Sequence, residues 1–489
     1  MKVLVVVNTS SNWPINIPGV EVVSARAYLT DPAYSRLRDA RVFNLCRSYS
    51  YQSLGYYVSL LATARGQKVL PSIATIQDMK SQAVVRVVSD ELDEIIQKDF
   101  GQLQSDAFVL SIYFGRNVAR RYDRVSLRLF NQFPAPMLRA HFKRDERWEL
   151  QSIGPISTSE VPAQHRPYIV RFAQEYFSKR SIPARRRGTS RYDLAILVNQ
   201  AEENPPSDPQ ALRRFVRAAA ALGMRAELID RDDYGRLAEY DALFIRETTQ
   251  VNHHTYRFAQ RAQAEGLVVI DDPESIVRCT NKVYLAETLE RNHIPMPRTM
   301  IVHKDNLDQV PTTLGFPCIL KRPDSSFSQG VIKVQSETEL AVAAARLFDV
   351  SELIVAQEFL PTEFDWRVGV FEGEPLHVCK YHMAREHWQI INWGGAERHR
   401  YGKWETLPAE AAPRGVVRTA LRAARLFGDG LYGVDLKQLG KQFCVIEVND
   451  NPSIEAGVED QVLKDELYGR IMRGFVRRLD ERRSWSVWK

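Results

Sequence analysis

Short apolar runs alternate with amphipathic stretches along most of the chain, and none of the apolar runs has the length of a membrane span. Val3 to Val7 is the first of them and predicts a buried strand. The stretch Ser53 to Ala64 has helical periodicity, as does Gln164 to Lys179. These patterns predict a mixed α/β domain over residues 1–180, in a protein of the cytoplasm.

The pattern over residues 191–275 predicts strands that alternate with helices. Asp193–Asn199 and Leu267–Ile270 are the first and last expected strands, and the first helix has Asp208 as its cap and Gly223 after its end. Strands joined by helices run parallel in one sheet. We therefore expect a compact Rossmann-like domain.

From residue 276 to residue 489 the pattern changes to paired strands with fewer helices. A helix is expected at Thr280–Arg291, followed by a small lobe over about residues 297–358. The strongest hairpin is the last one, Tyr432 to Asn449. This region is expected to be α+β, with antiparallel sheets. Residues 181–190, "SIPARRRGTS", are rich in proline, serine and arginine and predict a linker.

Charge and cysteine content narrow the class of protein only slightly. The chain has 66 basic and 60 acidic residues, a mild excess that by itself says little about nucleic acid, and a nucleic-acid partner is not expected. Its five cysteines lie far apart, so we expect neither a disulfide framework nor a structural zinc site. The pair His253-His254 is interpreted as exposed at the start of a helix. Tyr51, Tyr56 and Tyr57 are interpreted as core residues, and the basic C-terminal stretch as an amphipathic helix.

Candidate chemistry begins in the closing hairpin, at "VIEVNDNPS". Glu447 and Asn449 project from one face of the expected strand. A connection with an odd number of residues would place Asp435 directly opposite Glu447, whereas a two-residue turn would place it on the other face. The odd register gathers hard oxygen ligands suited to Mg²⁺. The alternative is an edge hairpin whose polar face lies in water.

Three further features favour binding of phosphate groups. Lys321 lies inside the apolar run "FPCILKRP", where a cation needs an anionic partner. The segment Asp324 to Val331, "DSSFSQGV", is a small polar turn that offers backbone amides and hydroxyls. Lys282 opens a predicted helix. A solvated surface explains any one of these features, but not all of them together with the acidic hairpin.

The order of these motifs resembles the ATP-grasp superfamily, specifically the RimK-like ligases. The motifs are Lys282, "ILKRPDSSFSQG", "VAQEFL", "DWRVGV", "GVDL" and "VIEVNDNPS", between about Tyr192 and Arg470. The N-terminal third is similar to the domain that precedes the grasp in some RimK-related proteins. The resemblance implies a Rossmann-like pre-grasp domain and an ATP-grasp fold of two α+β lobes.

The resemblance also implies a role for each matching residue. The expected catalytic residues are Arg367, Lys321 and Asn392. Those expected to bind ATP are Lys282, Lys321, Ser326, Ser328, Gly330, Gln357, Glu358, Phe359, Leu360 and Asp365. Two Mg²⁺ ions, with Mn²⁺ as an alternative, are expected on Asp435, Glu447 and Asn449. One departure is that "INWGGAERHR" has no arginine between Asn392 and the two glycines, so Arg398 or Arg400 would have to substitute.

The function that the resemblance implies is ATP-dependent carboxylate–amine ligation. An acyl phosphate would form and an amine would attack it, adding an amino acid to a peptide, protein or small-molecule acceptor. The alternatives are a kinase on the same scaffold and an ATP-binding interaction protein. A homo-oligomer is compatible with the sequence, and a membrane partner is not expected. The sequence does not define the two substrates, the oligomeric state or the role of the N-terminal domain.

Overall fold

The computed structural model contains two compact units, which are described separately. It describes residues 2–10, 20–37, 40–156, 160–178, 190–324, 330–385, 387–392 and 402–487. The first unit comprises residues 1–190 and 232–240, and the second comprises residues 191–231 and 241–489. Residues 181–189 of the expected linker lie outside the described residues.

The first unit begins with a four-stranded parallel sheet in the order β2-β1-β3-β4. Its strands are β1 (Lys2–Val7), β2 (Glu21–Ser24), β3 (Ala40–Asn44) and β4 (Lys68–Leu70). The short helices α1 (Ala25–Thr30) and α2 (Pro32–Ser35) and the longer α3 (Leu54–Ala64) belong to this part. The Ser53 side chain caps α3 by accepting a hydrogen bond from the backbone of Tyr56. The expected first strand and this helix are therefore present.

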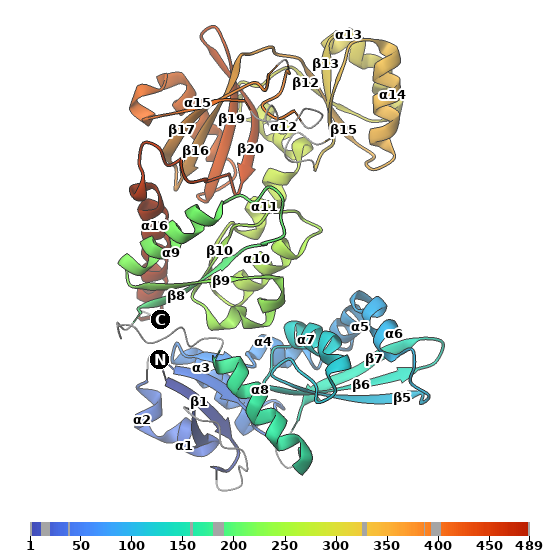
Figure 1. The fold of residues 1–489 in the computed structure, drawn as a ribbon, viewed down its shortest axis with the longest axis vertical. Coiled ribbons are helices and arrows are strands. Elements are labelled where there is room, and N and C mark those ends of the chain that lie inside the picture. Colours follow the sequence, from blue (N-terminus) through green and yellow to red (C-terminus); the bar gives the residue numbers. More distant parts are fainter. Residues whose placement is uncertain are drawn as a thin grey trace. The chain divides into compact units, whose positions relative to one another are not determined.

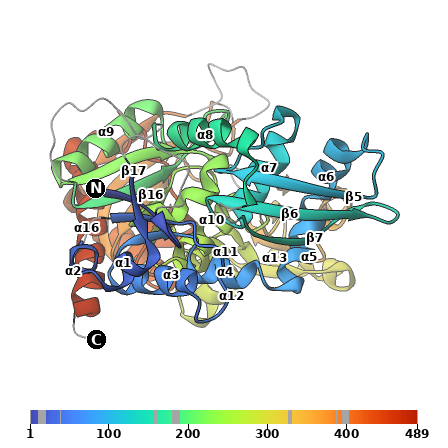
Figure 2. The same cartoon turned by 90° about the horizontal axis from the view of Figure 1, so that it is seen from below.

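An antiparallel sheet in the order β5-β6-β7 completes the first unit, and its strands lie side by side in Figure 2. They are β5 (Ala107–Tyr113), β6 (Met137–Arg144) and β7 (Trp148–Pro155). The helices of this part are α4 (Ile73–Asp78), α5 (Gln82–Glu91), α6 (Asp93–Phe100), α7 (Asp123–Gln132) and α8 (Arg166–Ser178). Burial of Tyr51 and Tyr57 was a wrong prediction, because their side chains are 70% and 37% exposed. They stack edge-on against Tyr56 beside α3 instead of filling the core.

The second unit begins with the expected parallel sheet, in the order β11-β10-β8-β9. Its strands are β8 (Tyr192–Leu197), β9 (Met224–Ile229), β10 (Ala242–Ile245) and β11 (Val268–Ile270). Helices α9 (Pro209–Ala221) and α10 (His254–Ala264) connect them, and Asp208 caps α9 as expected. The C-terminal helix α16 (Asp465–Val487) runs beside α9 (Figure 1) and buries Ile471 and Phe475 in the same core.

The single helix expected at Thr280–Arg291 is two helices in the structure. α11 (Pro273–Thr280) ends where that helix was expected to begin, and α12 (Lys282–Arg291) follows it. The break is at Asn281, whose side chain accepts hydrogen bonds from the backbone N–H groups of Val283 and Tyr284. This cap places Lys282 in the first turn of a new helix.

Two antiparallel sheets form the rest of the second unit (Figure 1). The smaller has the order β12-β15-β13-β14, with β12 (Thr299–Val302), β13 (Cys318–Lys321), β14 (Val331–Val334) and β15 (Ile354–Glu358). α13 (Val310–Leu314) and α14 (Glu337–Phe348) pack on it. The larger has the order β18-β17-β16-β19-β20, with β16 (Phe364–Phe371), β17 (Glu374–His382), β18 (Trp404–Leu407), β19 (Leu431–Leu439) and β20 (Gln442–Asp450). Its helix is α15 (Arg414–Ala424).

The closing hairpin reaches the expected pairing by an unexpected route. Its turn has only two residues, because Leu439 pairs with Gln442, and such a turn was expected to put Asp435 and Glu447 on opposite faces. A β-bulge opposite the step from Asp435 to Leu436 leaves Ile446 without a partner in this strand pair and shifts the register by one residue. Asp435 therefore pairs with Glu447 after all.

Two general expectations can be compared with the described residues. All five cysteines are buried and free. Among the helices that the structure describes, none is both long enough and apolar enough to span a bilayer.

Candidate active site

Two carboxylates and an amide lie together on β19 and β20. Asp435 pairs with Glu447 across the hairpin, and the Asn449 amide donates a hydrogen bond to Asp435 Oδ2 over 3.2 Å. The Asp435 and Glu447 side chains are 18% and 25% exposed. Because the amide nitrogen of Asn449 is used within the protein, its oxygen is left as an acceptor. Carboxylate and amide oxygens are the ligands that Mg²⁺ prefers.

Each carboxylate is paired with a cation from another element. Lys282 Nζ lies 2.7 Å from Glu447 Oε1, and Arg367 on β16 binds both oxygens of Asp435 over 2.6 and 2.7 Å. Burial alone would raise the pKa of Glu447, but Lys282 and Lys321 lower it below its usual value. Burial raises the pKa of Asp435, and Arg367 offsets only part of that rise. The protein thus supplies its own counter-charges to the carboxylates.

Lys321 is the most strongly perturbed cation of the site. Its ammonium group donates to Gln357 Oε1 over 2.8 Å, and its side chain is buried at the end of β13. Burial is the main cause that lowers the pKa of Lys321, Glu447 opposes it, and the charges of Lys282 and Lys437 add to it, so that the pKa is about 8. Within the part of the chain that the structure describes, the hydrogen-bond partner of this buried ammonium group is an amide, so the group is suited to receive an anion.

Lys437 is a site residue that the sequence analysis missed. It lies on β19, two residues after Asp435, and its ammonium group contacts Asp365 Oδ1 over 2.6 Å and the Thr362 hydroxyl over 2.7 Å. The expected ATP-binding residue Asp365 is therefore already ion-paired. The period of two along the strand was the available signal, because Lys437 lies on the same strand as Asp435 at the spacing that repeats a face.

The expected hinge, Gln357 to Leu360, joins the two lobes at the end of β15. The side chain of Glu358 is held by Arg298, whose backbone N–H and Nε donate to the carboxylate over 2.7 and 2.8 Å. Burial alone would raise the pKa of Glu358, but these hydrogen bonds lower it. Phe359 lies under the ammonium group of Lys333, which is 3.9 Å from the ring centroid. Backbone groups of the hinge are thus better placed than the Glu358 carboxylate to contact a base.

Some expected site residues fall outside the described part of the chain. Ser326 and Ser328 do so, as do Arg398 and Arg400. Gly330 is described and adopts a positive φ of 71°, and its carbonyl accepts a hydrogen bond from the Arg322 backbone. Asn392 is also described and is half-buried. The role of each of these residues stays a prediction.

Arg246 is a second residue that the sequence analysis missed. It is 1% exposed at the end of β10 and donates to Asn451 Oδ1 over 2.7 Å and to the Pro452 carbonyl over 2.8 Å. Burial lowers the pKa of Arg246 to about 10. Its guanidinium group fixes the segment that follows β20. A lone arginine at the end of an apolar run was its only signal.

Tyr381 and Glu459 support Arg367 from the side opposite Asp435. The guanidinium carbon of Arg367 lies 5.4 Å from the Tyr381 ring centroid, and the Tyr381 hydroxyl donates to Glu459. Burial raises the pKa of Glu459 to about 7. Neither residue matches a motif that the sequence analysis used, so long-range packing was needed to find them.

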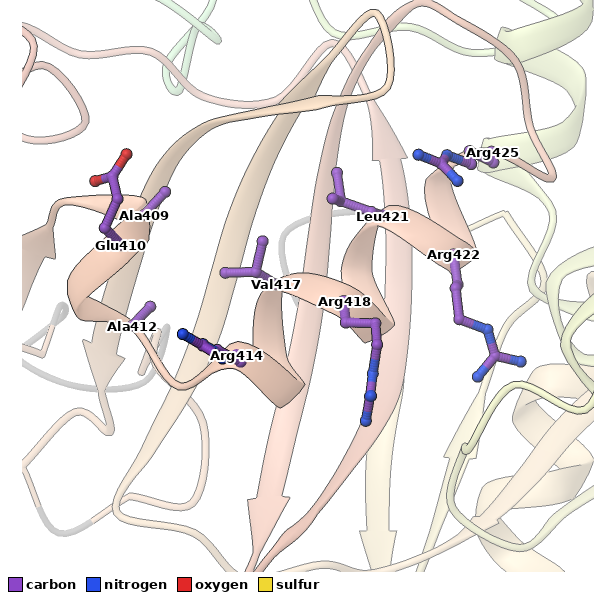
Figure 3. A pocket seen from close by; sticks show the side chains of 9 residues that line it. All are labelled: Ala409, Glu410, Ala412, Arg414, Val417, Arg418, Leu421, Arg422 and Arg425. Carbon is purple, nitrogen blue, oxygen red and sulfur yellow. The ribbon is translucent and has the colours of Figure 1, made fainter.

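A separate groove lies on α15, away from the acidic hairpin face. Its volume is about 500 Å³. Figure 3 shows the arginines that line it along one helix, Arg414, Arg418, Arg422 and Arg425. None of the residues predicted for ATP or metal binding lines this groove.

The sheets and the charged hairpin define an ATP-grasp protein, and comparison with known families specifies which one. Residues 279–471 match the RimK-like ATP-grasp domain, and residues 25–171 match the RimK-like ATPgrasp N-terminal domain. The chain therefore carries a RimK-like ATP-grasp domain together with the RimK-like N-terminal domain, and relatives that match it are named as ligases.

Two relatives and one solved structure are similar to parts of this chain. A probable alpha-L-glutamate ligase of Vibrio vulnificus (strain YJ016) is 25% identical over 232 residues, which are 47% of this chain and 74% of the relative. A protein of the same name from Marinomonas sp. is 23% identical over 272 residues, 52% of this chain and 87% of the relative. A crystal structure of a RimK domain ATP-grasp protein from Sphaerobacter thermophilus matches at a TM-score of 0.44 and 16% identity, covering 57% of this chain and 98% of that one.

Proposed function

We propose that this ligase activates a carboxylate with ATP and joins it to an amine, and that one of the two substrates is an amino acid. A carboxylate oxygen of the substrate attacks the γ-phosphorus of ATP, and ADP leaves. The amine then attacks the carbonyl carbon of the acyl phosphate, and inorganic phosphate leaves with one oxygen of the original carboxylate. The products are an amide, ADP and phosphate.

The observation that carries the proposal is the set of opposed charges in the second unit. Asp435, Glu447 and Asn449 offer oxygen ligands on one strand pair, while Lys282, Lys321 and Arg367 offer positive charge from three other elements. Phosphoryl transfer needs mainly positioning and neutralisation of charge, which this set can supply. Mg²⁺ bound to the three oxygen ligands would neutralise the charge of the triphosphate.

The lysines and Arg367 have separate tasks in this proposal. Lys282 and Lys321 hold the phosphate oxygens, and Lys321 exchanges its amide partner for an anion. Arg367 is fixed by Asp435 and by the Tyr381 ring, so its guanidinium group stays oriented while charge develops on the transferred phosphoryl group. The hinge backbone at Gln357–Leu360 contacts the adenine.

An isotope experiment tests the acyl phosphate directly. The protein is incubated with Mg²⁺-ATP, a peptide mixture and amino acids. Either the peptides or the amino acids carry ¹⁸O in their carboxylates. L-glutamate is the first amino acid to test, because the relatives carry it in their names. We expect phosphate release to depend on the acceptor, and the product to gain one amino acid minus water. ¹⁸O moves to phosphate when the labelled molecule supplies the activated carboxylate, so both substrates are labelled in turn.

Lys321→Met and Lys304→Met form a matched pair of variants for this assay. Lys304 is an exposed lysine of the same lobe, so K304M should keep the activity while K321M loses it. A product that retains the phosphoryl group, with no free phosphate, would favour the kinase alternative. ATP turnover that no acceptor changes would contradict ligation.

A further inference from the structure

A polar cluster lies at the carboxyl edge of the parallel sheet in the second unit, apart from the residues proposed for ATP. The strand order β11-β10-β8-β9 means that the chain leaves β8 toward one side, to β9, and later returns to the other side at β10. The carboxyl ends of β8 and β10 therefore flank a topological switch point, where open α/β sheets bind ligands. Asn199 follows β8 and Glu247 follows β10.

The cluster consists of Glu247 and the two histidines at the start of α10. Glu247 is only 2% exposed, and His254 Nε2 lies 2.9 Å from its Oε2. His253 stacks on His254 with 3.9 Å between the ring centroids. One ligand atom from each of the three residues lies within 4.8 Å of the others. The interpretation of His253 and His254 as exposed was wrong, because both are half-buried against this carboxylate.

We propose that Glu247, His253 and His254 bind a divalent transition-metal ion of the Zn²⁺ type. Two imidazoles and one carboxylate are a ligand set that zinc uses in open sites, whereas Mg²⁺ prefers oxygen ligands alone. Tetrahedral ligands at about 2.0–2.1 Å from zinc lie roughly 3.4 Å apart. The present donor atoms lie within 4.8 Å of one another, so binding of the ion would draw them together to that spacing.

Hydrogen bonds from neighbouring residues orient the side chains of the cluster, as is common for metal ligands in proteins. The Asn199 amide donates to Glu247 Oε1 over 3.2 Å, and the Thr255 hydroxyl lies 3.2 Å from His253 Nδ1. This leaves His253 Nε2 for an ion and fixes the carboxylate. Three protein ligands leave a fourth position for water or a substrate atom. The site is distinct from the Mg²⁺ ligands proposed on the closing hairpin.

Zinc binding to the untagged, nucleotide-free full-length protein tests the proposal. Bound metal is first removed from the protein with a chelator. The protein is then equilibrated with Zn²⁺, and the bound zinc is measured by elemental mass spectrometry. We expect about one Zn²⁺ per chain, and a loss of at least about 100-fold in affinity in His254→Ala and Glu247→Gln. His303→Ala is the matched control, because His303 forms an exposed pair with Asp305 over 3.8 Å. It should bind zinc like the parent protein.

Three outcomes would overturn the proposal. Zinc bound in substoichiometric amounts, or bound equally well by H254A and H303A, would indicate an adventitious ion only. Co²⁺ provides a readout that needs no variant, because a four-coordinate site gives intense visible absorption and a fully hydrated surface ion does not. Weak octahedral bands in the parent protein would reject the site even if H254A and E247Q failed to fold.

Discussion

The chain buries acidic side chains against cations in two ways, one in each unit. In the first unit Glu239 and Arg41 are 1% and 3% exposed, and Arg41 Nη1 lies 3.2 Å from Glu239 Oε2. The Tyr176 hydroxyl donates to the other carboxylate oxygen, and Lys68 donates to the Glu239 carbonyl over 2.6 Å. In the second unit Glu447 and Asp435 keep about a fifth of their surface exposed.

This difference separates a pair that stabilises the fold from a site that can bind a ligand. Around Glu239 both carboxylate oxygens are occupied and water is excluded, so a further cation has no access. Around Glu447 the charges of Lys282 and Lys321 act on a carboxylate whose side chain stays 25% exposed. Burial and charge pairing alone therefore do not indicate function. The partly exposed carboxylates of Glu447 and Asp435 are the ones for which we propose a ligand site.

The largest effect expected is that of Glu447→Gln on catalysis. The amide keeps an acceptor for Lys282 but removes a charge from the proposed magnesium ligands, so kcat should fall about 10²–10³-fold. The unfolding free energy should change by only about 1 kcal/mol. Phosphate release with an acceptor and thermal unfolding measure the two quantities. Glu374→Gln, an exposed glutamate of β17, is the control and should leave both unchanged. Equal activity of E447Q and E374Q would contradict the site.

Glu239→Ala should have the opposite profile. Removing the carboxylate takes the opposite charge from the buried Arg41, which keeps the Glu239 carbonyl as an acceptor, and should lower the stability of the first unit by about 3 kcal/mol. Hydrogen exchange of peptides that cover β3 should accelerate about a hundredfold, whereas peptides of the closing hairpin should not change. Glu175→Ala is the control, because the Arg116–Glu175 pair is more than 40% exposed on both sides. If β3 exchanged at the same rate in both variants, the Glu239 pair would not stabilise the unit.

The closing hairpin also indicates how far a sequence can specify such a site. Strand period placed Glu447 and Asn449 on one face, and that expectation agrees with the structure. The number of residues in the turn alone did not predict the position of Asp435, because it could not anticipate the bulge at Ile446. The bulge coincides with a hydrogen bond from the Val445 backbone N–H to the Pro295 carbonyl, 2.8 Å away. A contact with a residue so distant in sequence cannot be derived from the local pattern.

The same limit explains which other features were found or missed. The parallel sheet, the Asp208 cap and the amphipathic α16 follow from local periodicity and capping, and all were predicted. Arg246 was missed because its partners lie about 200 residues away in the sequence, as its hydrogen bond to Asn451 illustrates. Polar residues that support a site from another element carry little local signal.

The smallest effect expected is a pH dependence of ATP binding that Lys321 causes. Burial lowers the pKa of Lys321 to about 8, from an ordinary value near 10.5, so above pH 8 the free protein increasingly holds this lysine neutral. A triphosphate favours the charged form, so binding above pH 8 must take up a proton. The affinity for ATP should therefore fall by up to about tenfold per pH unit above pH 8. Below pH 8 Lys321 contributes no further pH dependence.

Calorimetry in buffers of different ionisation enthalpy measures this proton uptake, and Lys321→Arg provides the matched variant. Arginine stays charged over the whole range, so K321R should bind ATP with weaker affinity but without the dependence above pH 8. Glu239→Gln, in the buried Arg41–Glu239 pair of the first unit, should leave the pH profile of ATP binding unchanged, because that pair is closed to solvent. A parent protein whose affinity is flat from pH 8 to pH 9.5 would mean that Lys321 does not contact the phosphates. The proposed phosphate site would then lose Lys321, one of the cations that distinguish the surroundings of Glu447 from those of Glu239.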